Sequence, residues 1–164
     1  MHMLTRFSLE SWYFELIHEG APFSLCLSRM ALLGRRAAAF TLRGRDVNRR
    51  LEVSGKDLGV EEDGKRVRFG PGSLTEGEDG CQITWRHGGI ELDLSFRSDD
   101  APWLPANNGV LFERRGVFGE EIVRWVLPLP VARVTGTLNG QTVDTVGYHD
   151  FLETNVSPRA FPFE

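Results

Sequence analysis

The sequence lacks the residues that mark several common kinds of protein site. Its two cysteines, Cys26 and Cys81, lie far apart in apolar stretches, so we expect buried free thiols rather than a disulfide or a redox pair. The four histidines are widely spaced, and none has a second histidine or a cysteine at the spacing of metal ligands. A glycine-rich phosphate loop followed by a helix is also missing. We therefore expect no metal and no cofactor.

Neither charge nor hydrophobicity is concentrated in one part of the chain. The 19 basic residues are scattered among 23 acidic ones, the net charge is -4, and no basic stripe is available for nucleic acid. No apolar run approaches the roughly 20 residues that span a bilayer, and the N-terminus lacks the pattern of a secretory signal. We expect a cytoplasmic protein without stable membrane insertion and without a nucleic-acid partner.

Apolar and polar residues alternate along the whole chain, in about ten short stretches separated by Gly, Asn and Asp turns. Such strands form antiparallel hairpins, and closure into a barrel or a two-layer sandwich removes the raw edges of the sheet. We predict one all-β domain over residues 1–164, an antiparallel barrel of about eight to ten strands. Residues 119–127 could instead form two turns of helix, which Pro128 and Pro130 would end.

Aromatic residues are the first candidates for a binding site. Trp12 and Phe14 share one face of the first strand, and Tyr13 points to the other. A barrel of this size has room for one small ligand, and a barrel filled by its own side chains is the alternative. The other tryptophans, which either line a cavity together with Trp12 or fill the core, are Trp85, Trp103 and Trp125.

Residues 143–155, VDTVGYHDFLETN, place several reactive side chains at the end of a predicted strand. Alternation puts His149 on one face, and Tyr148 and Asp150 together on the other. His149 and Asp150 therefore cannot form a hydrogen-bonded pair in a regular strand. The alternative to a reactive site is that Asp150 caps the turn after the strand and His149 is exposed.

Two short motifs resemble those of the carotenoid 1,2-hydratase-like proteins, also called the hydroxyneurosporene synthase or AttH-like family. The first, E-x-W-Y-F, is matched by Glu10, Trp12, Tyr13 and Phe14. The second, G-Y-H-D-H-N-W-G-N-V, is matched by Gly147, Tyr148, His149, Asp150, Asn155 and Val156. The sequence departs from it at residues 151–153, where Phe, Leu and Glu stand in place of His, Asn and Trp.

The resemblance implies a lipocalin-like (calycin-type) barrel with an apolar pocket for an isoprenoid- or polyketide-like molecule, which the protein would hydrate, isomerise or cyclise. For hydration, Asp150 is the implied acid, with Glu10 and Glu153 as alternatives, and Tyr148 and His149 complete the predicted catalytic group. A non-catalytic lipid carrier, or a structural half of a two-barrel protein, is the alternative. The predicted substrate-binding residues are Glu10, Trp12, Tyr13, Phe14, Trp85, Trp103, Trp125, Glu153 and Asn155.

Members of the family normally continue into a second barrel packed against the first. The resemblance therefore implies a homodimer, or a complex with a separately encoded second barrel. The segments expected to make the contacts are Phe118 to Pro130 and Val156 to Phe163, which combine apolar residues with prolines.

Overall fold

The computed structural model describes residues 7–54, 58–60, 66–105, 107–116 and 119–156, and within these residues it has twelve β-strands and no helix. The strands are β1 (Phe7–His18), β2 (Ala21–Leu32), β3 (Arg35–Arg43), β4 (Asn48–Ser54), β5 (Leu58–Val60), β6 (Arg66–Phe69), β7 (Gly72–Glu76), β8 (Gly80–His87), β9 (Ile90–Arg97), β10 (Val110–Gly116), β11 (Gly119–Leu138) and β12 (Gln141–Thr154).

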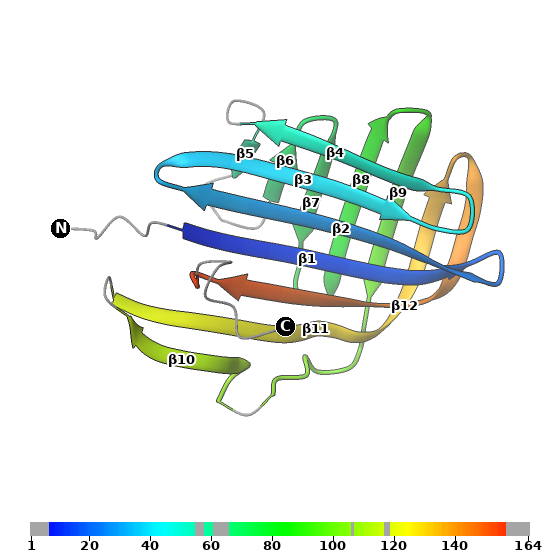
Figure 1. The fold of residues 1–164 in the computed structure, drawn as a ribbon. Coiled ribbons are helices and arrows are strands. Elements are labelled where there is room, and N and C mark those ends of the chain that lie inside the picture. Colours follow the sequence, from blue (N-terminus) through cyan, green and yellow to red (C-terminus); the bar gives the residue numbers. More distant parts are fainter. Residues whose placement is uncertain (1–6, 55–57, 61–65, 106, 117–118, 157–164) are drawn as a thin grey trace.

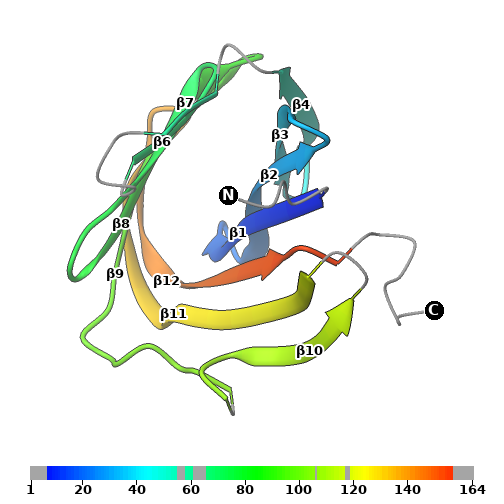
Figure 2. The same cartoon turned by 90° about the vertical axis from the view of Figure 1, so that its left-hand side faces the viewer.

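All strands belong to one antiparallel sheet (Figure 1), which confirms the predicted fold class. The order is β4-β3-β2-β1-β12-β11-β9-β8-β7-β6-β5, and β10 pairs with β11 outside this path. Along one edge, β11 pairs with two different strands: β10 (residues 110–116) pairs with its first half, and β9 (residues 92–97) pairs with its second half. Figure 2 shows the sheet curled on itself, with β10 outside the ring.

The strand number and the closure differ from the prediction. Residues 70–80, GPGSLTEGEDG, have the composition of a turn, but residues 72–76 form β7, because Gly72 and Leu74 are buried between β6 and β8. Among the described residues no backbone ladder joins β4 to β5, the two ends of the strand order. The barrel is therefore curled but is not closed by hydrogen bonds in that part of the chain.

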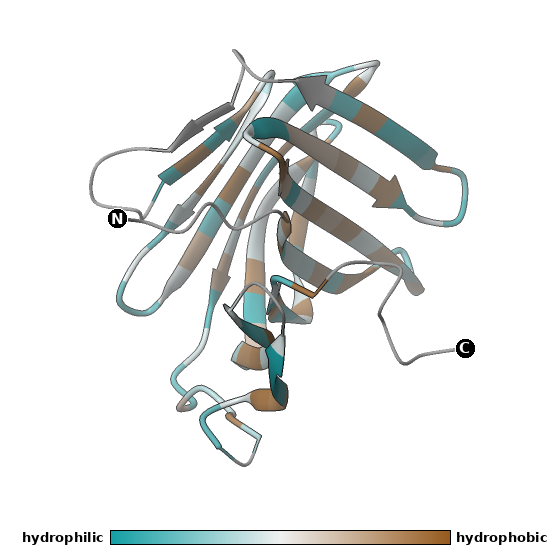
Figure 3. Ribbon diagram, turned by 60° about the vertical axis from the view of Figure 1, so that its left-hand side comes forward, coloured by the Kyte–Doolittle hydropathy of each residue, from teal (hydrophilic) through white to brown (hydrophobic). Residues whose placement is uncertain are grey.

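The core lies inside the curled sheet and follows the alternation along the strands (Figure 3). On β1 the buried side chains of Trp12, Phe14 and Leu16 face inward, and the residues between them face outward. Across the interior, the ring of Trp85 stacks on Phe40 with centroids 4.0 Å apart. Each such ring buries enough apolar surface to contribute a few kcal/mol to stability.

Residues 119–127 form a strand, so the alternative of a helix there was wrong. This segment pairs with β10 on one side and β12 on the other, and these pairings outweigh its local helix propensity. Pro128 and Pro130 lie where the register with β12 shifts, between Val126 and Ala132. A proline is tolerated at such an irregularity because no ladder hydrogen bond requires its missing N–H.

Gly147 occupies a position that has no room for a side chain. A Cβ atom there would lie 2.3 Å from the Glu15 carbonyl oxygen and 2.8 Å from Cγ2 of Val134. We expect Gly147→Ala to lower the free energy of unfolding by about 1 to 3 kcal/mol, since β1 and β11 would have to move apart. Urea denaturation measures this loss. Gly77→Ala is the control, because its nearest contact would be an ordinary 3.6 Å and the change should be small; equal stability of the two variants would contradict the packing at Gly147.

Candidate functional site

A cavity of about 460 Å³ lies inside the curled sheet, at the end where β7 turns into β8. This volume is in the range of sites for drug-sized ligands. Apolar lining comes from β1, β6, β11 and β12, through Trp12, Val67, Leu129 and Phe151. The ionisable side chains that line it are Glu10, Arg29, Glu76, Glu78, Cys81 and His149. An apolar chamber with a few polar groups is the usual composition of a small-molecule site.

Trp12 connects the apolar and polar parts of this cavity. Its ring packs against Phe151 on β12 at a centroid distance of 5.3 Å. The guanidinium of Arg29 on β2 lies 5.6 Å from the centroid of the Trp12 ring. The indole Nε1 donates a 3.1 Å hydrogen bond to the carboxylate of Glu76 on β7. The sequence prediction that Trp12 belongs to the cavity lining agrees with this placement.

Glu76 is a cavity residue that the sequence interpretation missed. It lies at the mouth, where part of its side chain is exposed, but its carboxyl group is partly enclosed by protein. This desolvation, helped by the nearby charge of Glu10, raises the pKa of Glu76, while the hydrogen bond from Trp12 opposes the shift. Its stretch, TEGEDG, has only the signature of a turn, so no sequence pattern marked it as a site.

His149 is buried and neutral. Its ring stacks on Phe14 at 4.1 Å, and Nδ1 lies 3.0 Å from the backbone carbonyl oxygen of Tyr13. Burial lowers the pKa of His149 to about 4, although the hydrogen bond to Tyr13 opposes this. The alternative prediction of an exposed His149 was wrong.

Charged residues form a row across the inner face near the mouth. Glu10 on β1 lies opposite Glu153 on β12. Each of the two is also paired with an arginine on its other neighbouring strand, β2 for Glu10 and β11 for Glu153. Arg29 forms an ion pair with Glu10, and Arg124 lies 3.5 Å from Glu153. Since like charges facing each other across a ladder are unfavourable, these two pairs keep the adjacent carboxylates compatible. Glu10 lines the cavity, whereas Glu153 is exposed at the end of its strand.

Tyr148 and Asp150 lie on the outer face of the sheet, so the prediction that they face the cavity was wrong. Tyr13 is paired with Asp150, and the Tyr13 and Tyr148 rings are 5.8 Å apart on this outer face. Burial raises the pKa of Asp150, and a hydrogen bond with Trp125 opposes the shift. Alternation establishes which residues share a face, but here both faces carry aromatic residues and the pattern did not show which one points inward.

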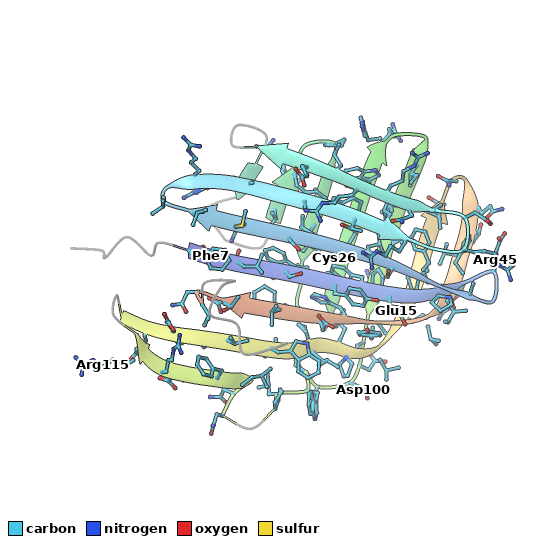
Figure 4. All side chains as sticks on the ribbon, viewed as in Figure 1. Phe7, Glu15, Cys26, Arg45, Asp100 and Arg115 are labelled. Carbon is cyan, nitrogen blue, oxygen red and sulfur yellow. The ribbon has the colours of Figure 1, made fainter. Side chains whose placement is uncertain are left out.

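The outer cluster collects several residues that were predicted to bind substrate. Tyr13 donates a 2.7 Å hydrogen bond to Glu15, and burial is the main cause that raises the pKa of Tyr13. Trp125 packs edge-on against Trp103 at 5.6 Å, and Trp103 bridges to the backbone of β11 at Leu127. In Figure 4, Glu15 and Cys26 mark this face on β1 and β2.

Only Trp12 among the tryptophans lines the main cavity, so the prediction of a shared tryptophan cavity was wrong. Trp85 is packed in the core and borders a different space of about 190 Å³ next to Arg49. Phe14 is fully buried behind His149 rather than exposed to the cavity.

Asn155, predicted to bind substrate, instead connects the end of β12 to β11. Its side chain accepts a hydrogen bond from the Ile122 amide and donates one to the Glu120 carbonyl oxygen.

Both cysteines are free as predicted, but only Cys81 is buried, and Cys26 is half-exposed on the outer face. In the part of the chain that the structure describes, no group of three His, Cys, Asp or Glu side chains could hold a metal ion, and no helix is long and apolar enough to cross a membrane. Phe118 and residues 157–163, predicted as partner contacts, lie outside the described residues, and Val156 is buried.

No protein-family model matches the sequence, and a comparison with curated proteins found no significant relative. Solved structures with the same fold do exist. A protein from Nitrosomonas europaea, provisionally named AttH, matches 96% of this chain with a TM-score of 0.65 at 12% identity. Kievitone hydratase from Nectria haematococca matches 96% with a TM-score of 0.57 at 9% identity, and CghA, determined with Sch210972, matches 92% with a TM-score of 0.50 at 16% identity.

The match covers 53%, 52% and 47% of those three chains, so this chain spans about half of their length. At these identities the comparison concerns the fold. The chain therefore has the AttH-like lipocalin barrel fold that its sequence motifs predicted.

Proposed function

We propose that the 460 Å³ cavity binds an apolar, isoprenoid- or polyketide-like small molecule, and that Glu76 and His149 act on it as acid and base. The observation that carries the proposal is their position in one aromatic cavity, with the acid held by Trp12 and the base held by the Tyr13 carbonyl. The fold shared with a hydratase supports a reaction of this class.

Hydration of a ligand double bond is the reaction that this arrangement suits best. Protonated Glu76 gives its proton to one alkene carbon, and the π electrons of the double bond form the new C–H bond. The positive charge on the other carbon is stabilised by the faces of Trp12 and Phe151. Water then forms a C–O bond with this carbon and loses a proton to His149 Nε2, and return of that proton to Glu76 completes the cycle.

A low pKa does not prevent His149 from serving as this base. Water bound to a carbocation is a far stronger acid than an imidazolium ion, so even a weakly basic nitrogen removes its proton. The carboxyl group that acts as the acid needs a pKa above the ordinary value to hold its proton at neutral pH. The pKa of Glu76 is raised, which is a shift in that direction.

Tryptophan fluorescence with a panel of neutral polyenes and isoprenoids tests binding. We expect quenching that disappears in Trp12→Phe and persists in Trp125→Phe, because the first ring lines the cavity and the second lies on the outer face. Mass analysis of the recovered ligand tests turnover, since hydration adds the mass of one water. Quenching with an unchanged ligand would identify a lipid carrier, and absence of quenching by every compound would contradict the proposed site.

We expect Glu76→Gln to lower the rate of hydration by roughly 10²-fold while binding is retained, because the amide keeps the shape but cannot donate the acid proton. Asp150→Asn is the matched comparison on the outer face. The catalytic role predicted for Asp150 from the motif would be supported by the reverse result, a loss with Asp150→Asn and normal activity of Glu76→Gln.

The outer face is also the surface that we propose for a second copy of this chain. Ile17, Val131 and Val146 come from three neighbouring strands and are 42%, 59% and 61% exposed, and Trp103 and Leu104 extend this apolar area. Apolar surface of this kind usually marks an interface, and a two-fold dimer would cover it. Sedimentation at micromolar concentration should show a dimer that Val146→Lys dissociates; a monomeric parent protein would contradict this.

The cytoplasmic location of the protein stays a prediction.

A further inference from the structure

The ionisable residues around the cavity give it an excess of negative charge. Glu10, Glu76 and Glu78 line it, and among the described lining residues Arg29 is the one arginine or lysine. Both Nε and a terminal nitrogen of Arg29 contact the same Glu10 carboxylate oxygen. The guanidinium is thereby committed to Glu10, and Glu78 forms no ion pair with any residue that the structure describes.

The inner part of the cavity offers a hydrogen-bond acceptor of fixed orientation. A backbone carbonyl oxygen accepts and cannot donate, so the contact with Tyr13 places the proton of neutral His149 on Nδ1. Nε2 then carries a lone pair. No described group hydrogen-bonds to Nε2, and no buried side-chain nitrogen or oxygen lacks a partner in the described part of the chain. Nε2 is therefore accessible from the cavity that His149 lines.

We infer that the cavity selects neutral apolar molecules that carry a hydroxyl group, and that it rejects the carboxylate analogues of the same molecules. The hydroxyl donates to Nε2 of His149 while the apolar body contacts Trp12, Phe151 and Leu129. This selectivity rests on the proposed function, because it concerns the ligand of the same cavity.

A carboxylate is rejected for two separate reasons. It has no proton to donate to Nε2, so the two lone pairs face each other, and at the mouth it meets the carboxylate of Glu78, which forms no ion pair with a described residue. An ammonium group would be attracted at the mouth, but beside neutral His149 it would be desolvated among apolar side chains without a counter-charge. A neutral hydroxyl avoids both penalties.

Four probes with one hydrocarbon skeleton test the inference: farnesol, farnesyl methyl ether, farnesoic acid and farnesylamine, titrated at pH 8 and low ionic strength. We expect farnesol to bind at least tenfold more tightly than farnesoate. It should bind about threefold to tenfold more tightly than the ether, which lacks the donor. Equal affinities, or tightest binding of the amine, would overturn the selectivity but leave apolar binding intact. Failure of all four to bind would instead count against the proposed function.

Two variants locate the selectivity in named residues. Glu10→Gln removes the partner of Arg29, so the freed guanidinium should improve the affinity for farnesoate at least tenfold relative to the affinity of the same variant for farnesol. Glu52→Gln is the matched control, because Glu52 also pairs with an arginine, Arg50, but lies outside the cavity. His149→Phe should remove the preference for farnesol over the ether; retention of that preference would show that another group binds the hydroxyl.

Discussion

Lowering the pH from 7 to 4 should reduce the free energy of unfolding by about 3 kcal/mol through His149 alone. Its pKa is about 4 in the folded protein and 6.5 as the ordinary value, so the unfolded chain binds a proton first as the pH falls. The stabilising contribution is complete above pH 6.5 and is lost progressively as the pH falls to about 4. Urea denaturation at a series of pH values measures this loss.

A comparison of variants separates His149 from the other groups that titrate. The raised pKa values of Glu76 and Asp150 act in the opposite direction, because the folded protein binds their protons first and gains stability as the pH falls. His149→Phe keeps a ring against Phe14 and should lose most of the dependence between pH 6.5 and 4. His87→Gln, at an exposed position, should retain it. If His149→Phe and the parent protein show the same pH dependence, His149 is not a buried neutral group in the folded protein.

Phe14→Ala should lower the free energy of unfolding by about 3 to 5 kcal/mol, the usual range for a buried phenylalanine. The ring is 1% exposed and lies between Phe96, at a centroid distance of 5.1 Å, and His149 on the other side. Neither neighbour can fill the space without leaving its own strand position, so the cavity would persist.

Ile17→Ala is the matched control, because Ile17 lies on the same strand but faces outward and is 42% exposed. We expect that change to have a much smaller effect, of no more than about 1 kcal/mol. Thermal and urea unfolding of the two variants under identical conditions would test the assignment of faces on β1. A larger loss for Ile17→Ala than for Phe14→Ala would mean that the faces are exchanged.

The fold was predictable because its information is local. The alternation that puts Trp12 and Phe14 on the same face of β1 is visible in five residues, and the Asn139–Gly140 turn has the positive φ values, 50° and 79°, that its sequence predicts. The strand β7 was missed because its burial depends on β6 and β8, which lie on either side of it in the sheet. Local composition alone suggested a loop.

The candidate site was predictable only in part, because it depends on how distant strands meet. Glu10, Trp12 and His149 were found from short motifs, and all three line the cavity. Glu76 was missed because its partner Trp12 is 64 residues away in the sequence. For Asp150 the error was one of orientation: strand alternation grouped it with Tyr148 but could not state which side of the sheet is concave.

The incomplete closure of the sheet gives the Trp12–Glu76 hydrogen bond a mechanical role. With no ladder between β4 and β5 among the described residues, the curvature of the ring depends partly on side chains that tie one wall to the other. The bond from β1 to β7 is such a tie, and the stacked Phe40 and Trp85 rings join β3 to β8 in the same way. A ligand that contacts Trp12 on β1 and Val67 on β6 at the same time would add a further contact between the two walls of the barrel. The stiffness of the barrel and the occupancy of its cavity are therefore coupled quantities.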